Sequence, residues 1–96
     1  MEANEQKLID RRLARLEGQI RGIRRMVSEE AYCCDILNQV AAVNSAISQV
    51  AGLVASQHIK HCLIGHGTNE AHPATKHLSK EDVMDELDDI LSRLVR

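Results

Sequence analysis

One helical repeat of apolar residues runs through the middle of the chain and constrains the fold more than any other feature. Its members are spaced alternately by four and three positions: Ile36, Val40, Val43, Ile47, Val50 and Val54. This spacing puts them along one side of an α-helix, and no proline interrupts the segment. The same steps lead outward to Cys33 at one end, and to His58 and then Cys62 at the other. One long helix is therefore expected to carry a thiol at the start of its buried stripe and an imidazole and a thiol at its end.

Cys33 and His58 cannot meet within one helix. They are 25 positions apart (58 − 33), which corresponds to roughly 37 Å at a rise of ~1.5 Å per residue. If the helix packs antiparallel against a second copy, Cys33 of one chain lies near His58 and Cys62 of the other. A two-fold axis then makes two equivalent sites. The spacing alone thus predicts a homo-oligomer with ligand sites between its subunits.

The length of 96 residues predicts one small domain, 1–96, which gains stability by oligomerisation. Tyr32 is the only aromatic residue, and there are one proline and five glycines, so an aliphatic, all-α core is expected. No apolar run is long enough to span a membrane, and the polar start is no secretory signal. Three cysteines, two of them adjacent, favour free thiols in a reducing, cytoplasmic setting over a disulfide framework.

Three helices are predicted. Residues 1–5 are expected to be disordered, and a first helix runs over about 5–28 with its own four–three apolar seam. After a short turn the long helix follows and ends at Gly65, and 65–79 reads as a loop. Ser79 and Asp82 form a capping-box pattern that opens a third helix. Two long helices joined by a short turn predict an antiparallel hairpin, and two hairpins predict a four-helix-bundle dimer.

Charge is distributed unevenly along a chain whose net charge is only −2. Residues 7–25 contain seven basic and two acidic side chains, whereas residues 79–96 contain three basic and six acidic ones. One face of the first helix combines basic residues with glycines, and Arg21 lies on the same helix: Arg11, Arg15, Gly18, Gly22 and Arg25. The plain interpretation is a solvated basic face. The functional one is a surface for the DNA backbone, with Arg11, Arg15, Arg21 and Arg25 as contacts.

The donor set of two thiols and one imidazole fits trigonal Cu(I) best among the metals that thiolates and imidazoles bind. Zinc prefers a fourth ligand, which His61 or His66 would supply, and nickel is a further alternative. A cysteine on a helix seam is more often a small core residue than a ligand, so the argument rests on the three residues together. Cys34 points about 100° away from Cys33 and is an accessory thiol or extra ligand. We expect His66, His72 and His77 to be surface residues.

The segments RLARLEGQIRGIRRMV, YCCDILNQVAAVNSAI and HIKHC resemble the CsoR-type (copper-sensitive operon repressor) family over roughly residues 8–65. The resemblance implies an all-α dimer of hairpins, assembled further into a tetramer, and DNA binding without a helix-turn-helix. It places the metal ligands at Cys33, His58 and Cys62 and a hydrogen-bonding tyrosine at Tyr32. An acidic partner from the third helix is also implied, and Glu81 and Glu86 are its candidates.

These features predict a repressor that binds operator DNA in its apo form and releases it on binding Cu(I). Sensing of zinc, nickel, persulfides or aldehydes by the same frame is the alternative. An alternative from a different class is a copper-storage or redox bundle that does not bind DNA. Such a protein would not need the basic face of the first helix, so this face favours the repressor. No motif for nucleophilic, phosphate or metal hydrolytic chemistry is present, so an enzyme is not expected.

Overall fold

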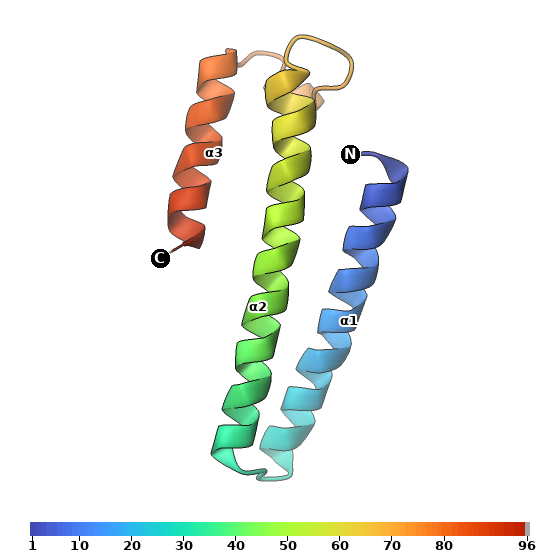
Figure 1. Ribbon diagram of the computed structural model, residues 1–96, viewed down its shortest axis with the longest axis vertical. Coiled ribbons are helices and arrows are strands. Elements are labelled where there is room, and N and C mark those ends of the chain that lie inside the picture. The colour runs from blue at the N-terminus through green and yellow to red at the C-terminus, as the bar shows by residue number, and fades with distance from the viewer. Residues whose placement is uncertain (96) are drawn as a thin grey trace. The chain divides into compact units, whose positions relative to one another are not determined.

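The computed structural model describes residues 1–95, and helices dominate it (Figure 1). The α-helices are α1 (Ala3–Ser28), α2 (Cys33–His58) and α3 (Lys80–Leu94). A π-helix, η1 (Ile59–Ile64), continues directly from α2, and a 3₁₀-helix, η2 (Pro73–Thr75), precedes α3. No strand forms within residues 1–95, so the prediction of an all-α chain with three main helices is confirmed. In the same residues, no helix has both the length and the apolar content needed to cross a bilayer.

The chain divides into two compact units, whose boundary falls within α2. The hairpin unit is Glu2–Leu53, and the α3 unit is Val54–Arg96 together with Met1. In the hairpin unit α1 runs antiparallel to α2 (Figure 1). Ile9, Leu16 and Val50 form its buried core, and further apolar residues of α2 pack against them: Val43, Ala46 and Leu53.

The start of α1 corrects one prediction. Residues 1–5 were expected to be disordered, but the helix already begins at Ala3. The amide of Gln6 donates to the carbonyl of Glu2 at 2.9 Å and closes the first turn. Alanine and glutamate are good helix formers, so the polar composition of this segment does not oppose a helix.

A Schellman motif ends α1 and turns the chain into α2. The amide of Ala31 donates to the carbonyl of Met26 at 2.9 Å, and that of Glu30 donates to the carbonyl of Val27 at 3.2 Å. Glu30 has a φ of 55°, which lies in the left-handed region that glycine usually fills. Cys33 opens the next helix three residues after Glu30, so the turn fixes where the first thiol begins.

Half of each apolar seam lacks a partner in the hairpin unit. The residues that remain exposed are spaced by seven positions on each helix: Leu13, Ile20 and Val27 on α1, and Val40 and Ile47 on α2. Four of the intervening seam residues pack in the core between α1 and α2: Ile9, Leu16, Val43 and Val50. Each helix of the hairpin therefore has a row of exposed apolar residues, one in every seven positions.

The α3 unit has a separate core, in which η1 contacts α3. Cys62, Leu63 and Val83 are buried together, and Leu78 and Leu87 pack against them. The Ser79 hydroxyl accepts from the Asp82 amide at 3.0 Å, and the Asp82 carboxylate accepts from the Ser79 amide at 3.3 Å. The capping box expected from the sequence is thus confirmed, and it starts α3 at Lys80.

The end of the second helix differs from the regular α-helix expected up to Gly65. The α-helix stops at His58, and Ile59–Ile64 form a π-helix that ends at Gly65. A π-turn holds one residue more than an α-turn and is often found at functional sites. Here the wider turn accompanies the burial of two consecutive residues, Cys62 and Leu63, in one core.

Gly65 is expected to be essential for this ending. A Cβ atom at Gly65 would lie 2.6 Å from the backbone oxygen of His61 and 3.2 Å from the Cβ of Glu70. Gly65→Ala should therefore destabilise the protein by about 1–3 kcal/mol through overpacking. Gly22→Ala is the matched control, because a Cβ at Gly22 meets nothing within 4 Å and alanine favours a helix by about 1 kcal/mol. Thermal unfolding followed by circular dichroism should show a lower midpoint for the first variant and an unchanged or higher one for the second.

Candidate functional site

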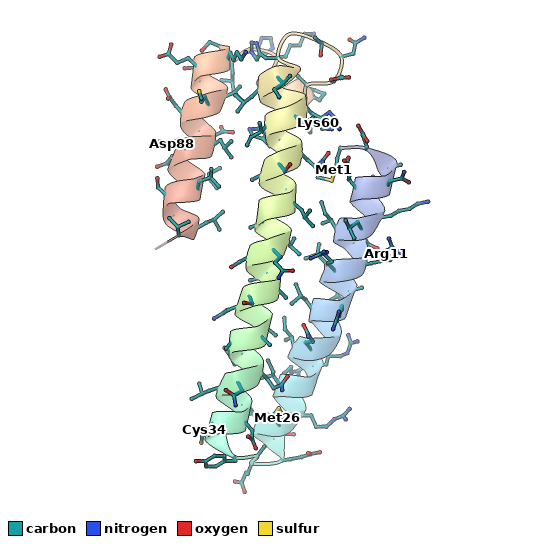
Figure 2. All side chains as sticks on the ribbon, viewed as in Figure 1. Met1, Arg11, Met26, Cys34, Lys60 and Asp88 are labelled. Atoms are coloured by element: carbon teal, nitrogen blue, oxygen red, sulfur yellow. The ribbon has the colours of Figure 1, made fainter. Side chains whose placement is uncertain are left out.

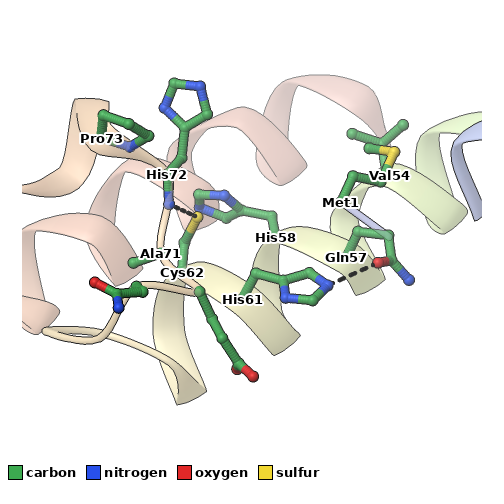
Figure 3. A pocket seen from close by; sticks show the side chains of 11 residues that line it. Met1, Val54, Gln57, His58, His61, Cys62, Ala71, His72 and Pro73 are labelled. Atoms are coloured by element: carbon green, nitrogen blue, oxygen red, sulfur yellow. Dashed lines mark hydrogen bonds between the residues drawn. The ribbon is translucent and has the colours of Figure 1, made fainter. Parts of the chain in front are cut away.

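Cys62 is the most enclosed of the three thiols. It lies in η1 with an exposed fraction of 5%, whereas Cys33 and Cys34 are exposed. The main-chain amide of His72 points at the Cys62 sulfur, with an N···Sγ distance of 3.5 Å (Figure 3). Val83 of α3 belongs to the same buried cluster as Cys62. The sulfur is therefore shielded from water and has a defined hydrogen-bond donor.

A cavity of about 390 Å³ opens beside Cys62 (Figure 3). Its lining combines one thiol with three imidazoles and one carboxylate: Cys62, His58, His61, His72 and Glu70. Thiolate and imidazole groups suit Cu(I), Zn(II) and Ni(II). The residues present thus fit a soft or borderline metal, and the assignment of His58 and Cys62 as ligands stays a prediction.

Hydrogen bonds assign different roles to the histidines of the α3 unit. The Nε2 of His61 donates to the side-chain oxygen of Gln57 at 3.1 Å, and the Nε2 of His66 donates to the carbonyl of Leu78 at 2.8 Å. The Nδ1 of His72 accepts from the amide of Ala74 at 3.0 Å. Within residues 1–95 the ring of half-buried His58 makes no hydrogen bond, so both of its nitrogens are available to a ligand.

Three of the predicted site residues lie at or next to the N-terminus of α2, far from Cys62 along the chain: Tyr32, Cys33 and Cys34. Cys33 is the first residue of this helix and His58 is its last. Cys34 is also exposed, and the Tyr32 side chain is 69% exposed. The structure brings His58 and Cys62 to one cavity but leaves Cys33 in the other unit.

The acidic candidates for the metal environment, Glu81 and Glu86, are both on α3 and both exposed. Glu81 is in the first turn of this helix. The packed face of α3 is instead formed by Val83 and Leu87. A role for either carboxylate beside the metal stays a prediction.

The predicted DNA contacts are exposed side chains of α1: Arg11, Arg15, Arg21 and Arg25. Figure 2 shows Arg11 on the side of α1 that faces away from α2. Around Gly22 the surface is open, since an added Cβ would meet nothing within 4 Å. A Cβ added at Gly18 would make only an ordinary contact of 3.7 Å with the Arg21 side chain. Packing within the chain therefore does not require glycine at either position, which leaves room for a molecule to approach the helix backbone.

A further arginine of α1, Arg12, was not singled out from the sequence and lies beside α2. Its Nη1 donates to the side-chain oxygen of Gln49 at 2.9 Å and links α1 to α2. Arg12 and Arg15 line a groove of about 550 Å³ between the two helices, together with polar side chains that include Gln19 and Gln49. The spacing of Arg12, Arg15 and Gln19 by three and four positions was the available signal for a polar stripe beside the core.

The chain is thus helical, with thiol and imidazole groups around one cavity and with exposed arginines on α1. A sequence model described as metal-sensitive transcriptional repressor matches residues 5–93, and the chain belongs to this family. This confirms the family resemblance given above.

Curated relatives and a solved structure agree with the family. The chain is 49% identical to the copper-sensing transcriptional repressor RicR of Mycobacterium tuberculosis over 53 residues, 55% of each protein. It is 44% identical to the copper-sensing transcriptional repressor CsoR of Bacillus subtilis over 61 residues, 64% of this chain and 60% of that protein. The matches thus span little more than half the length of these relatives.

The crystal structure of the copper-sensing repressor CsoR with Cu(I) from Geobacillus thermodenitrificans has the same fold. The TM-score is 0.80 at 32% identity, and the match covers 100% of this chain and 92% of that one. A fold of three main helices, with α1 paired to α2, is therefore shared with a known member of the family.

Proposed function

We propose that this protein is a transcriptional repressor that binds operator DNA when metal-free and is released from it by Cu(I). The observation that carries the proposal is the division of one donor set between the two ends of α2. His58 and Cys62 share a cavity in the α3 unit, and Cys33 begins the helix in the hairpin unit. A second chain, packed antiparallel, would supply the missing thiol. The copper-sensing relatives and the Cu(I)-containing family structure support copper as the effector.

The exposed heptad positions support a homodimer as the functional unit. Apolar residues at every seventh position on both helices of a hairpin are typical of a four-helix bundle in which a second hairpin covers them. Leu13 and Ile20 of α1 and Ile47 of α2 would form this interface. A pair of dimers, making a homotetramer, would place further copies of the basic surface along DNA. We treat residues 1–96 as one functional domain of this assembly.

Copper is favoured over zinc and nickel by the named relatives and by the number of donors in the predicted set. Zn(II) sites usually have four ligands, and His61 and His66 are the nearest additions to the predicted set of three. The ring Nε2 of each donates to an oxygen, of Gln57 and of Leu78 respectively, so either histidine would bind a metal through Nδ1. The three donors of the predicted set, Cys33 of one chain with His58 and Cys62 of the other, suit Cu(I) without a fourth ligand. When bound, Cu(I) would supply bonds that tie the start of one α2 to the end of its partner's.

Cu(I) bound between the chains would affect DNA binding through the turn between α1 and α2. Only Ala31 and Tyr32 separate Cys33 from Glu30, the left-handed residue of the Schellman motif that ends α1. Holding Cys33 against a partner chain therefore restricts the end of α1. The arginines of α1 must match phosphates at fixed spacing, so a small shift of the helix weakens several contacts together. Allosteric pairs of this kind typically have a coupling free energy of about 1–3 kcal/mol.

Fluorescence anisotropy of labelled DNA from the region upstream of the protein's own operon tests the proposal. The apo protein should bind, and Cu(I) should release it. Arg15→Ala should bind more weakly, with a salt dependence reduced by about one counterion per lost phosphate contact, because Arg15 is exposed on the basic face. Cys33→Ala should keep the apo affinity but stay on DNA after Cu(I) is added.

Two results would count against the repressor. Absence of binding by the apo protein at low salt would favour a copper-storage bundle, because such a protein does not require the basic surface. Release by Zn(II) or Ni(II) but not by Cu(I) would retain the repressor and change the effector. A family of transcriptional repressors gives no reason to expect enzymatic activity.

A further inference from the structure

We propose that the main-chain amide of His72 is a built-in hydrogen-bond donor to the Cys62 sulfur and sets how tightly this thiolate holds a metal. The inference rests on the proposed function, because it treats Cys62 as a ligand. It gives the segment between η1 and α3 a role at the site, and it makes His72 a positioning residue whose imidazole is not a ligand.

The hydrogen bond from the His72 amide can persist when the Cys62 sulfur binds a metal. The N···Sγ distance is 3.5 Å, and Cys62 is only 5% exposed, so little of its surface is open to water. A thiolate that binds a metal keeps lone pairs that accept hydrogen bonds. Such bonds to a ligating sulfur orient it and adjust the electron density that it gives to the metal.

The His72 amide is held in place by its neighbours. The carbonyl of His72 accepts from the Thr75 amide at 2.9 Å and from the Thr75 hydroxyl at 2.7 Å. Its ring Nδ1 accepts from the Ala74 amide at 3.0 Å, which caps η2. Thr75 itself is 7% exposed. The two bonds to the His72 carbonyl therefore hold the N–H group in its direction, whereas the ring bond caps η2.

The same segment connects the sulfur to α3. His66 donates to the carbonyl of Leu78, and Leu78 packs against the buried cluster of Cys62 and Val83. The position of the His72 amide therefore depends on the packing of the segment between η1 and α3 as well as on the bonds to Thr75 and Ala74. Removing a partner that hydrogen-bonds a metal ligand typically lowers metal affinity by 10–100-fold.

Two substitutions of one residue separate the amide from the ring. His72 has a φ of −61° and a ψ of 139°, values that proline adopts without strain, so His72→Pro removes the N–H group together with the imidazole. His72→Ala keeps the N–H group and removes the imidazole. Competition with a chromophoric Cu(I) chelator should give about a 10–100-fold weaker affinity for His72→Pro and a change of less than about threefold for His72→Ala. The ultraviolet absorption from thiolate to Cu(I) should shift only in the proline variant.

Hydrogen exchange of the wild-type and Cys62→Ala proteins tests the bond without proline. The His72 amide should be protected in the wild type and exchange at least about tenfold faster in Cys62→Ala, which has no sulfur acceptor. The Thr75 amide, bonded to the His72 carbonyl, is the internal control and should change little. Equal exchange of the His72 amide in both proteins would overturn the inference.

Equal Cu(I) affinities of the proline and alanine variants would also overturn the inference, even if Cu(I) still releases the wild type from DNA. A wild type that binds DNA but ignores Cu(I) would instead contradict the proposed function. In that case the exchange experiment still decides whether the His72 amide bonds to the sulfur.

Discussion

Refolding a mixture of Cys33→Ala and Cys62→Ala chains is expected to restore copper binding that neither variant shows alone. Each variant by itself should lose the high-affinity site, because every site would keep one thiol instead of two. In a mixed dimer, Cys33 of one chain meets His58 and Cys62 of the other, so one complete site forms. Random pairing of equal amounts makes half of the dimers mixed, and about a quarter of the wild-type sites should return.

Titration with Cu(I) against a competing chelator measures this number directly. Cys34→Ala is the matched control, since Cys34 is the adjacent exposed thiol and its loss should leave the full number of sites. Recovery in the mixture is possible only if the ligands come from two chains. A mixture that binds no more copper than its separate components would place the site within one chain and remove the basis of the proposed switch.

Periodicity predicted the helices well because burial of an apolar stripe is a regional property of the sequence. The four–three steps on α1 and α2 gave both helices and their pairing, and local chemistry at Ser79 and Asp82 gave the start of α3. The start of α1 was placed too late, since a polar segment can be helical when its residues favour a helix.

The details of the site depend on contacts between residues that are distant in sequence, and these were not predictable. No residue type specifies a π-helix at Ile59–Ile64, so the end of α2 was expected to be regular. His72 was assigned to a solvated loop, but its amide meets Cys62 ten residues away. Arg12 was one of seven basic residues until its bond to Gln49 placed it at the groove. Spacing did predict that His58 and Cys62 lie together, and both line one cavity, because they are only four positions apart along the chain.

Ile47→Glu is expected to convert the protein into monomers. In the hairpin unit Ile47 is 45% exposed, so a single chain can accommodate glutamate there. In the proposed dimer the side chain would be buried between hairpins, where an unpaired charge costs about 3–5 kcal/mol. Two-fold symmetry introduces the charge twice, which makes the cost at least ~6 kcal/mol and weakens association by roughly 10⁴-fold.

Light scattering coupled to size-exclusion chromatography should report the mass of one chain for Ile47→Glu at micromolar concentration. Asn38→Glu is the matched control, because it adds the same charge to an exposed position nine residues away, on the opposite side of α2. This control should keep the mass of the wild-type assembly. The monomer should also lose the high-affinity Cu(I) site, since Cys33 then has no partner chain. If Ile47→Glu keeps the wild-type mass, the exposed heptad residues do not form the subunit interface. If it is monomeric and still binds Cu(I) normally, a single chain completes the site.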